Sequence, residues 1–331
     1  MRVLVTGARG FVGRYLCDLL LARRHNVWGT FLQDDCAPVA SGLHLIKCDL
    51  RNFSDVRKAV EQVQPQHVYH LAALSSVRNS FDDARSVYEA NFWGALHLLE
   101  AVRAHQPSAR VLLVGSAHEY GKVTRAKLPI TEQHPLAPDT PYGVSKAAAD
   151  LLGSQFFQSY NINVIRARPF NHTGPGQSAH FVCSDFARQF AAIDLGRAQP
   201  ILRVGNVGMA RDFSDVRDIV RAYELLLTKG VSGEAYNVGS GRAVPLSRIL
   251  AILESLTSHA VRINVERKRV RSGESDVVYG SNRKLKKATG WTAEFDLKTT
   301  LRDLYFYWKA NLEAEPTSFP QIAPTGTNAP S

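Results

Sequence analysis

Residues 2–13 read Arg2-Val3-Leu4-Val5-Thr6-Gly7-Ala8-Arg9-Gly10-Phe11-Val12-Gly13, a short apolar stretch that leads into three glycines spaced three residues apart. Gly7 permits a tight turn after a strand, Gly10 lets the backbone approach a phosphate, and Gly13 lets the next helix pack closely on the strand. The first amides of that helix have no partner within it and carry the positive end of its dipole. The segment therefore predicts a strand, a turn and a helix that hold the pyrophosphate of a dinucleotide through Gly7, Arg9, Gly10, Phe11, Val12 and Gly13.

Short apolar segments and amphipathic segments alternate along the first half of the chain. We expect strands at residues 2–6, 26–31, 44–46, 67–71, 110–114 and 163–168. We expect helices at residues 12–23, 54–63 with Ser54 as N-cap, 91–103 and 142–160. Because consecutive parallel strands need a crossover, this alternation predicts an α/β fold with a doubly wound parallel sheet of the Rossmann type.

The pattern becomes irregular after Pro169. We expect residues 1–169 to form the Rossmann domain, and residues 207–240 to return to it through a helix at 215–229 and a strand at 235–238. Residues 170–206 and 241–312 would then build a smaller C-terminal lobe. Residues 315–331 are rich in Pro, Thr and Asn, a composition that predicts a disordered tail.

The overall composition is that of a soluble globular protein, with 45% hydrophobic and 21% charged residues. The apolar runs are short and interrupted by charges, so we expect neither a membrane span nor a signal peptide. The four cysteines lack the spacing of metal ligands, and we expect reduced thiols, a cytoplasmic location and no metal site. They are Cys17, Cys36, Cys48 and Cys183.

The net charge is +10, and much of it lies in residues 266–271 and 283–287. Such runs form either a solvated basic face or a site for an anionic partner. Aromatic residues do not alternate with the basic ones, and no recognition helix is evident, so we do not expect nucleic acid as a partner. A small phosphorylated substrate fits the other motifs better.

Tyr142 and Lys146 are four residues apart in an expected helix, and their side chains therefore share one face. A nearby ammonium favours the phenolate, so Lys146 is expected to lower the pKa of Tyr142 from its usual value of about 10 and make it an acid/base. Lys146 can also hold the nicotinamide ribose. Ser116 follows the fifth strand at the edge where ligands of such sheets bind, and its hydroxyl can hydrogen-bond a substrate carbonyl.

Together these motifs resemble the extended short-chain dehydrogenase/reductases that act on nucleotide sugars, over residues 1 to about 312. The matching residues are Thr6 to Gly13, Asp49-Leu50, His70-Leu71-Ala72-Ala73, Asn91, Ser116 with Tyr120-Gly121, Tyr142 with Lys146, and Arg168-Pro169-Phe170-Asn171. The resemblance places Asp49 and Leu50 at the adenine, and Leu71, Ala72 and Ala73 along the cofactor. It also implies a homodimer or homotetramer paired through the helices near 91–103 and 142–160.

Within that family the chain is most similar to enzymes that reduce GDP-4-keto-6-deoxy-D-mannose to GDP-D-rhamnose, and GDP-mannose 4,6-dehydratases share much of the pattern. Four stretches carry this likeness: residues 171–177, residues 204–206 with 211–213, residues 215–218, and residues 280–282 with 289–291. The resemblance implies that the smaller lobe binds a GDP-sugar, held at its GDP part by Asn171, Arg211, Arg271 and Glu274. The arginine fork suits a diphosphate. The family usually reads Arg-Pro-x-Glu where this chain has Arg271-Ser272-Gly273-Glu274, so we expect a more mobile loop here.

The choice between NADP(H) and NAD(H) depends on the end of the second strand. An acidic residue about 20 positions after the glycine turn would bind the ribose of NAD. Here the strand reads Gly29-Thr30-Phe31-Leu32-Gln33, and the first acid is Asp34. Arg9 lies within the glycine turn, where it can meet a 2′-phosphate. These features favour NADP(H) and leave NAD(H) open.

Reduction and dehydration differ in the groups that must move protons. A 4-keto reductase needs a hydride and a proton from Tyr142, whereas a dehydratase needs a further base and acid. Such dehydratases carry a Glu two places before the tyrosine of the Tyr-Gly pair. This chain has His118 there, and Glu119 next to Tyr120 should point to the opposite face if the segment is extended. An irregular segment would change this, and His118 can itself exchange protons.

Phe11 also resembles the reductase turn rather than the Gln-containing turn of the dehydratases. We therefore predict 4-keto reduction. The alternatives are a GDP-mannose 4,6-dehydratase, a GDP-heptose analogue, a UDP-sugar epimerase and a non-catalytic dinucleotide-binding protein.

Overall fold

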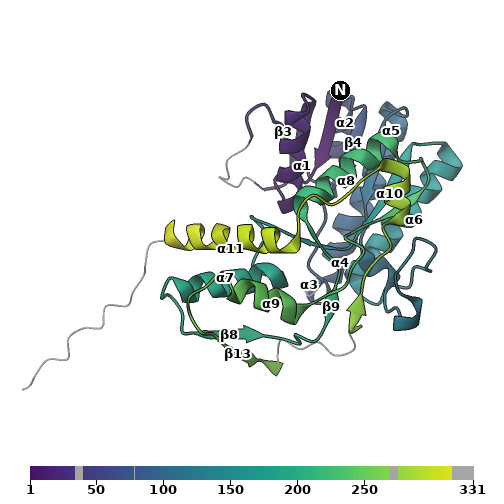
Figure 1. The fold of residues 1–331 in the computed structure, drawn as a ribbon. Helices are drawn as coiled ribbons and strands as arrows, with labels where there is room; N and C mark the ends of the chain where they lie inside the picture. The colour runs from purple at the N-terminus through teal and green to yellow at the C-terminus, as the bar shows by residue number, and fades with distance from the viewer. Residues whose placement is uncertain (34–39, 78, 268–274, 315–331) are drawn as a thin grey trace, which may run out of the picture.

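A computed structural model describes residues 1–33, 40–77, 79–267 and 275–314, and it is built around a seven-stranded sheet (Figure 1). The strand order is β11-β6-β5-β4-β1-β2-β3, and every pairing in the sheet is parallel. The strands are β1 (Arg2–Thr6), β2 (Asn26–Phe31), β3 (His44–Lys47), β4 (His67–His70), β5 (Arg110–Val114), β6 (Val164–Pro169) and β11 (Ala235–Val238). The predicted doubly wound parallel sheet is confirmed.

Helices cover both faces of this sheet. One face carries α2 (Phe53–Val63), α5 (Gly94–His105) and α6 (Pro141–Tyr160), and the other carries α1 (Phe11–Ala22) and α8 (Val216–Lys229). Successive residues of a strand point to opposite faces. In β1, Val3 and Val5 accordingly join the core beneath α1 and α8, whereas Leu4 joins the core beneath α2 and α5. Burial on both sides explains why these strands are continuously apolar.

Two helix starts differ from the sequence prediction. Asn52, rather than Ser54, caps α2, because its side-chain oxygen accepts a hydrogen bond from the Ser54 amide at 3.0 Å. The helix expected from residue 91 is preceded by α3 (Asn79–Asp82), α4 (Ala84–Tyr88) and a π-helical turn, η1 (Glu89–Trp93). Asn91 in that turn is buried and donates to the Leu74 carbonyl and to Ser145 Oγ.

A second hydrophobic core lies in the lower lobe of Figure 1. It is formed by α7 (Val182–Asp194), β8 (Ile201–Val204), α9 (Leu246–Glu254) and α11 (Leu297–Ala314). The exposed strand β13 (Arg262–Val265) pairs with β8 at the surface of the lobe. Short strands join this lobe to the sheet, namely β7 (Asn171–Thr173), β9 (Ala210–Arg211), β10 (Phe213–Asp215), β12 (Val244–Pro245) and β14 (Val277–Val278). The helix α10 (Arg283–Thr289) falls within the expected lobe range, yet Leu285 and Trp291 pack in the main core. The expected tail at 315–331 lies outside the described residues.

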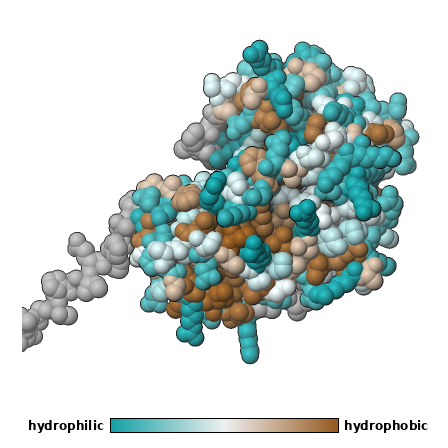
Figure 2. Space-filling model, in the orientation of Figure 1, coloured by the Kyte–Doolittle hydropathy of each residue, from teal (hydrophilic) through white to brown (hydrophobic). Residues whose placement is uncertain are grey.

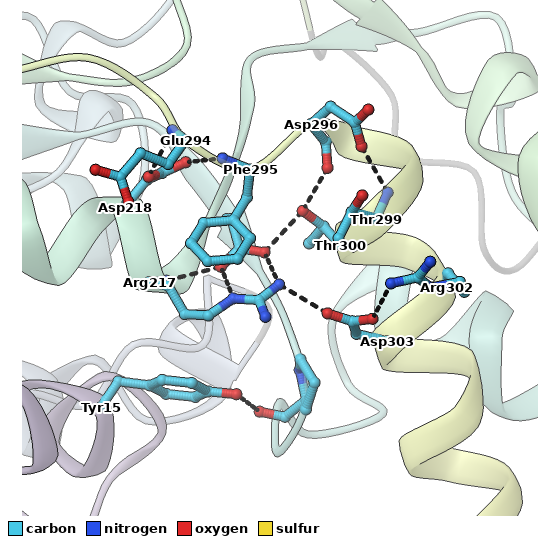
Figure 3. A network of polar contacts seen from close by, with 12 residues as sticks. Tyr15, Arg217, Asp218, Glu294, Phe295, Asp296, Thr299, Thr300, Arg302 and Asp303 are labelled. Carbon is cyan, nitrogen blue, oxygen red and sulfur yellow. Dashed lines mark hydrogen bonds and ion pairs between the residues drawn. The ribbon is translucent and has the colours of Figure 1, made fainter.

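A network of charges joins α8 to α11 (Figure 3). The Arg217 guanidinium donates to both carboxylate oxygens of Asp215 at 2.8 and 2.7 Å and to Asp303 at 2.9 Å. It also lies 3.7 Å from the centre of the Phe295 ring, and Thr300 donates to Asp215. Since Asp303 and Thr300 belong to α11, this network attaches the lobe to the main domain.

The face drawn in Figure 2 shows hydrophobic residues gathered on the lobe. Exposed apolar side chains on its two-stranded β8–β13 sheet are Ile201, Ile263 and Val265. Within the described ranges, no helix combines the length and the hydrophobicity that crossing a membrane requires.

Candidate active site

At two of the three glycines in the turn, Gly7 and Gly13, there is no space for a side chain. Gly7 has a φ of +70°, and a Cβ placed there would lie 2.9 Å from the Ala72 backbone. A Cβ on Gly13 would lie 2.2 Å from the Gly7 carbonyl oxygen, which also accepts a hydrogen bond from the Gly10 amide at 3.0 Å. The turn therefore packs directly against residues 71–73, the other predicted cofactor segment.

The start of α1 is open to an anion. Gly10 caps the helix without a side chain, and its first turn contains no acidic residue. Helix amides there are available to a phosphate. Arg9 and Arg14 line two clefts beside this helix end, one formed with Phe11, Tyr15, Pro175 and Gly176, and one with Ala40 and Leu43. The Arg9 guanidinium lies 5.2 Å from the centre of the Phe31 ring, at the end of β2.

Arg14 is a binding candidate that the sequence reasoning missed. The one feature of the sequence that could have indicated it is its position, as a basic residue near the start of the helix that follows the glycine turn.

The predicted adenine residues follow β3. Asp49 accepts hydrogen bonds from the Arg51 guanidinium at distances down to 2.7 Å, and these bonds lower the pKa of its carboxyl. The Leu50 carbonyl lies 2.8 Å from His97 Nδ1, and Gly94 packs against the Leu50 side chain. Asp49 is thus already paired within the chain, so any contact with adenine would have to be made alongside Arg51. The adenine assignment stays a prediction.

Ser116, Tyr142 and Lys146 come together at the carboxyl end of β5. Ser116 caps the 3-10 turn η2 (Ala117–Tyr120), and its side chain lies close enough to Tyr142 to act on the pKa of the phenol. Tyr142 and Lys146 lie on the buried face of α6. Lys146 Nζ donates to the Val114 carbonyl at 2.8 Å.

Burial dominates the acidity of these two side chains. It raises the pKa of Tyr142 to about 12 and lowers the pKa of Lys146 to about 8. The Ser116 side chain opposes this rise in the pKa of Tyr142. The expected lowering of the Tyr142 pKa by Lys146 is not seen, because the ammonium is directed at the Val114 carbonyl. Tyr142 is therefore protonated at neutral pH, which suits a proton donor.

The segment after Ser116 is a 3-10 turn and not the extended segment that we considered. Glu119 is fully buried, and its Oε1 accepts a hydrogen bond from the Ser116 amide at 2.7 Å. Its Oε2 lies 3.3 Å from Arg168 Nε. His118 is exposed, and its ring meets that of Tyr142 edge-on at a centroid distance of 5.8 Å. The two neighbours thus face opposite ways, with His118 on the side of Tyr142.

The predicted GDP-binding residues are only partly described. Asn171 begins β7 and follows Phe170, which packs with Tyr120 at the end of the η2 turn. Arg211 lies in β9, pairs in register with Val278 of β14, and donates to the Asp276 carbonyl at 3.3 Å.

Arg271 and Glu274 lie outside the described residues. Asn171 follows the end of β6, and Ser116 follows the end of β5. Because these two strands are parallel neighbours, both residues lie at the same edge of the sheet. Arg211 lies beside the segment that resumes at Ser275.

Known proteins share both the sequence pattern and the fold. The family model described as GDP-mannose 4,6 dehydratase matches residues 4–304. GDP-6-deoxy-D-mannose reductase of Pseudomonas aeruginosa is 35% identical over 314 residues, which cover 95% of this chain and 99% of that protein. Human GDP-mannose 4,6 dehydratase is 28% identical over 295 residues, or 84% of this chain and 74% of that protein.

Among solved structures, RMD from Pseudomonas aeruginosa complexed with NADPH matches with a TM-score of 0.82 and 32% identity, over 94% of this chain and 100% of that chain. These matches confirm the predicted class of enzyme, an NAD(P)-dependent oxidoreductase of nucleotide sugars. The chain belongs to the GDP-mannose 4,6 dehydratase family, within the extended short-chain dehydrogenase/reductase fold.

Proposed function

We propose that this enzyme reduces the 4-keto group of GDP-4-keto-6-deoxy-D-mannose to give GDP-D-rhamnose, with NADPH as the reductant. The observation that carries the proposal is the orientation of the η2 turn. Its one carboxylate, Glu119, is buried against Arg168 and the Ser116 amide, and the side chain that faces Tyr142 is His118. Dehydration needs an additional base for C5 and an acid for C6. Glu119 is also fully buried, and burial together with the nearby Asp150 raises its pKa to about 8, so it is poorly suited to act as that base at neutral pH.

The glycine turn fits a dinucleotide, since Gly7 and Gly13 allow the turn and α1 to pack closely and the start of α1 is uncapped by a side chain. Bound NADPH would supply the hydride that reduces C4. Tyr142 is protonated at neutral pH and donates its proton to the oxygen of the reduced carbonyl. Ser116 hydrogen-bonds the same oxygen and keeps it within reach of Tyr142. Lys146 provides a nearby positive charge while it remains protonated.

Three further features support parts of this proposal. The relative that is 35% identical over nearly its whole length is a GDP-6-deoxy-D-mannose reductase. Arg9 and Arg14 line a cleft with Leu43 near the end of β2, where a 2′-phosphate would lie, and this favours NADP(H) over NAD(H). Trp93 and Leu151 are exposed on the helices expected to pair subunits, which supports a homodimer or homotetramer.

Product analysis tests the reaction directly. Purified protein is incubated with GDP-mannose and catalytic NADP⁺, and separately with NADPH and GDP-4-keto-6-deoxy-D-mannose. We expect no 4-keto product in the first reaction and stoichiometric NADPH oxidation in the second, with GDP-D-rhamnose identified by mass and NMR. Formation of the 4-keto sugar from GDP-mannose would show that the enzyme is a dehydratase. The corresponding GDP-heptose and UDP-sugars serve as comparison substrates.

Tyr142→Phe tests the proposed proton donor. We expect it to retain NADPH affinity and to lose about 10²- to 10⁴-fold in turnover, the usual contribution of general acid catalysis. Tyr160→Phe is the matched control, because Tyr160 lies at the exposed end of the same helix. A Tyr142→Phe variant with near wild-type turnover would remove Tyr142 from the reaction.

A further inference from the structure

Arg168 on β6 contacts three side chains from two other elements, α6 and the η2 turn. Its Nε and Nη2 donate to the two carboxylate oxygens of Asp150 at 2.9 and 2.8 Å, and its Nη1 donates to the Tyr120 hydroxyl at 3.0 Å. Its Nε also lies 3.3 Å from Glu119 Oε2. Asp150 is on α6, one turn beyond Lys146. One buried guanidinium therefore connects the η2 turn to the helix that carries Tyr142.

Glu119 connects this guanidinium to Ser116. Its Oε1 accepts the Ser116 amide hydrogen bond at 2.7 Å, and the Ser116 hydroxyl in turn accepts a hydrogen bond from the His118 amide at 3.2 Å. Gly115 leaves the space that the carboxylate occupies, since a Cβ there would lie 2.1 Å from Oε1. The Glu119 side chain is thus confined between strand β5 and Arg168.

These contacts connect Ser116 to the helix of Tyr142 by a second route. The Ser116 side chain lies near Tyr142, the Ser116 amide donates to Glu119, and Glu119 lies 3.3 Å from Arg168. Arg168 in turn donates to Asp150, which is on the same helix as Tyr142. We propose that Glu119 is a positioning residue, which with Arg168 holds the Ser116 hydroxyl against Tyr142 during the reaction. This inference rests on the proposed function, because it takes Ser116 and Tyr142 as the groups that contact the substrate oxygen.

Two substitutions separate the hydrogen bond of Glu119 from its acidity. Burial and the nearby Asp150 raise the pKa of Glu119 to about 8, and Arg168 opposes that rise. Glu119→Gln keeps an oxygen that can accept from the Ser116 amide but cannot ionise. Glu119→Asp keeps a carboxyl group for Arg168 but shortens the side chain by one methylene. We expect kcat within about threefold of wild type for the Gln variant and a loss of about tenfold for the Asp variant, the size expected for one hydrogen bond, with KM unchanged in both. NADPH binding and thermal unfolding establish that each variant is folded.

A double-mutant cycle shows whether Glu119 acts through Ser116. The loss of kcat in Glu119→Asp should largely disappear in a Ser116→Ala background, because the hydroxyl to be positioned is then absent. Glu234→Asp is the matched control, since it shortens a carboxylate that pairs with Lys284 outside these contacts. Its effect on kcat should add to that of Ser116→Ala. Equal losses from Glu119→Asp in both backgrounds, or a folded Gln variant that loses as much as the Asp variant, would overturn the proposal.

A readout without substrate keeps this test separate from the proposed reaction. Crystal structures of the two variants should show Ser116 Oγ as close to the Tyr142 hydroxyl as in the wild type in Glu119→Gln, and farther from it in Glu119→Asp. If wild-type enzyme does not reduce the keto sugar, the proposed function fails while these structures still decide the role of Glu119. An undisplaced Ser116 in Glu119→Asp would refute that role even in an active reductase.

Discussion

Gly10 and Gly13 are close in sequence but should respond in opposite ways to alanine. A Cβ on Gly13 would lie 2.2 Å from the Gly7 oxygen and 2.8 Å from the Ala8 oxygen, both backbone atoms that cannot rotate away. A Cβ on Gly10 would meet only the Gly7 oxygen, at 3.2 Å, and Gly10 is exposed. Gly13→Ala therefore disturbs the fold, whereas Gly10→Ala mainly obstructs the approach of a phosphate.

The geometry sets the expected magnitudes. In Gly13→Ala the start of α1 must move away from β1 by roughly 1 Å, an overpacking change that costs about 1–3 kcal/mol of unfolding free energy. In Gly10→Ala the methyl group separates the helix amides from the pyrophosphate. Losing one hydrogen bond to a charged group costs about 1.5–3 kcal/mol, which is roughly 10- to 150-fold in the Kd of NADPH.

Urea unfolding without cofactor and fluorescence titration with NADPH measure the two quantities. We expect Gly10→Ala to unfold within about 1 kcal/mol of wild type, since alanine is only a poorer N-cap than glycine. It should nevertheless bind NADPH poorly. Gly13→Ala should be impaired in both assays. The reasoning is refuted if Gly10→Ala binds NADPH as wild type does, or if Gly13→Ala is as stable as wild type.

Three further outcomes test the site and the core. Arg9→Ala should raise the Kd of NADPH about tenfold or more and leave that of NADH nearly unchanged in fluorescence titrations, because only NADPH carries the 2′-phosphate; equal losses for both would contradict a phosphate contact. The reductive kcat should fall as pH rises above about 8, where Lys146 loses its proton, and Lys146→Arg should shift this fall to higher pH; a flat wild-type profile would exclude Lys146. Burial lowers the pKa of His70 to about 3 in the folded chain. In the unfolded chain this histidine has its ordinary pKa of about 6.5, so below that pH it binds a proton that the folded chain does not bind. Stability should therefore fall with decreasing pH by about 1.4 kcal/mol per pH unit from this group in urea unfolding, and an equal slope in a folded His70→Asn variant would assign the effect elsewhere.

Much of the fold could be predicted because its signals are local. A strand needs alternating or continuous apolar residues, and the glycine turn needs small residues at three defined positions. The spacing of Tyr142 and Lys146 likewise places them on one helix face whatever surrounds the helix. Helix starts were less certain, as at α2, because the side chains of Asn52 and Ser54 are both good caps.

The sequence by itself thus determined the parallel sheet, the glycine turn at its edge and the shared face of Tyr142 and Lys146. Only the tertiary structure decided what those groups can do. The burial that makes Tyr142 a protonated donor comes from packing, and so does the pairing of Glu119 with Arg168, 49 positions away in the chain. No sequence period or spacing predicts a contact between residues so far apart. Glu119 and Arg168 come within 4 Å of each other only after β5, which precedes the η2 turn, has paired with β6.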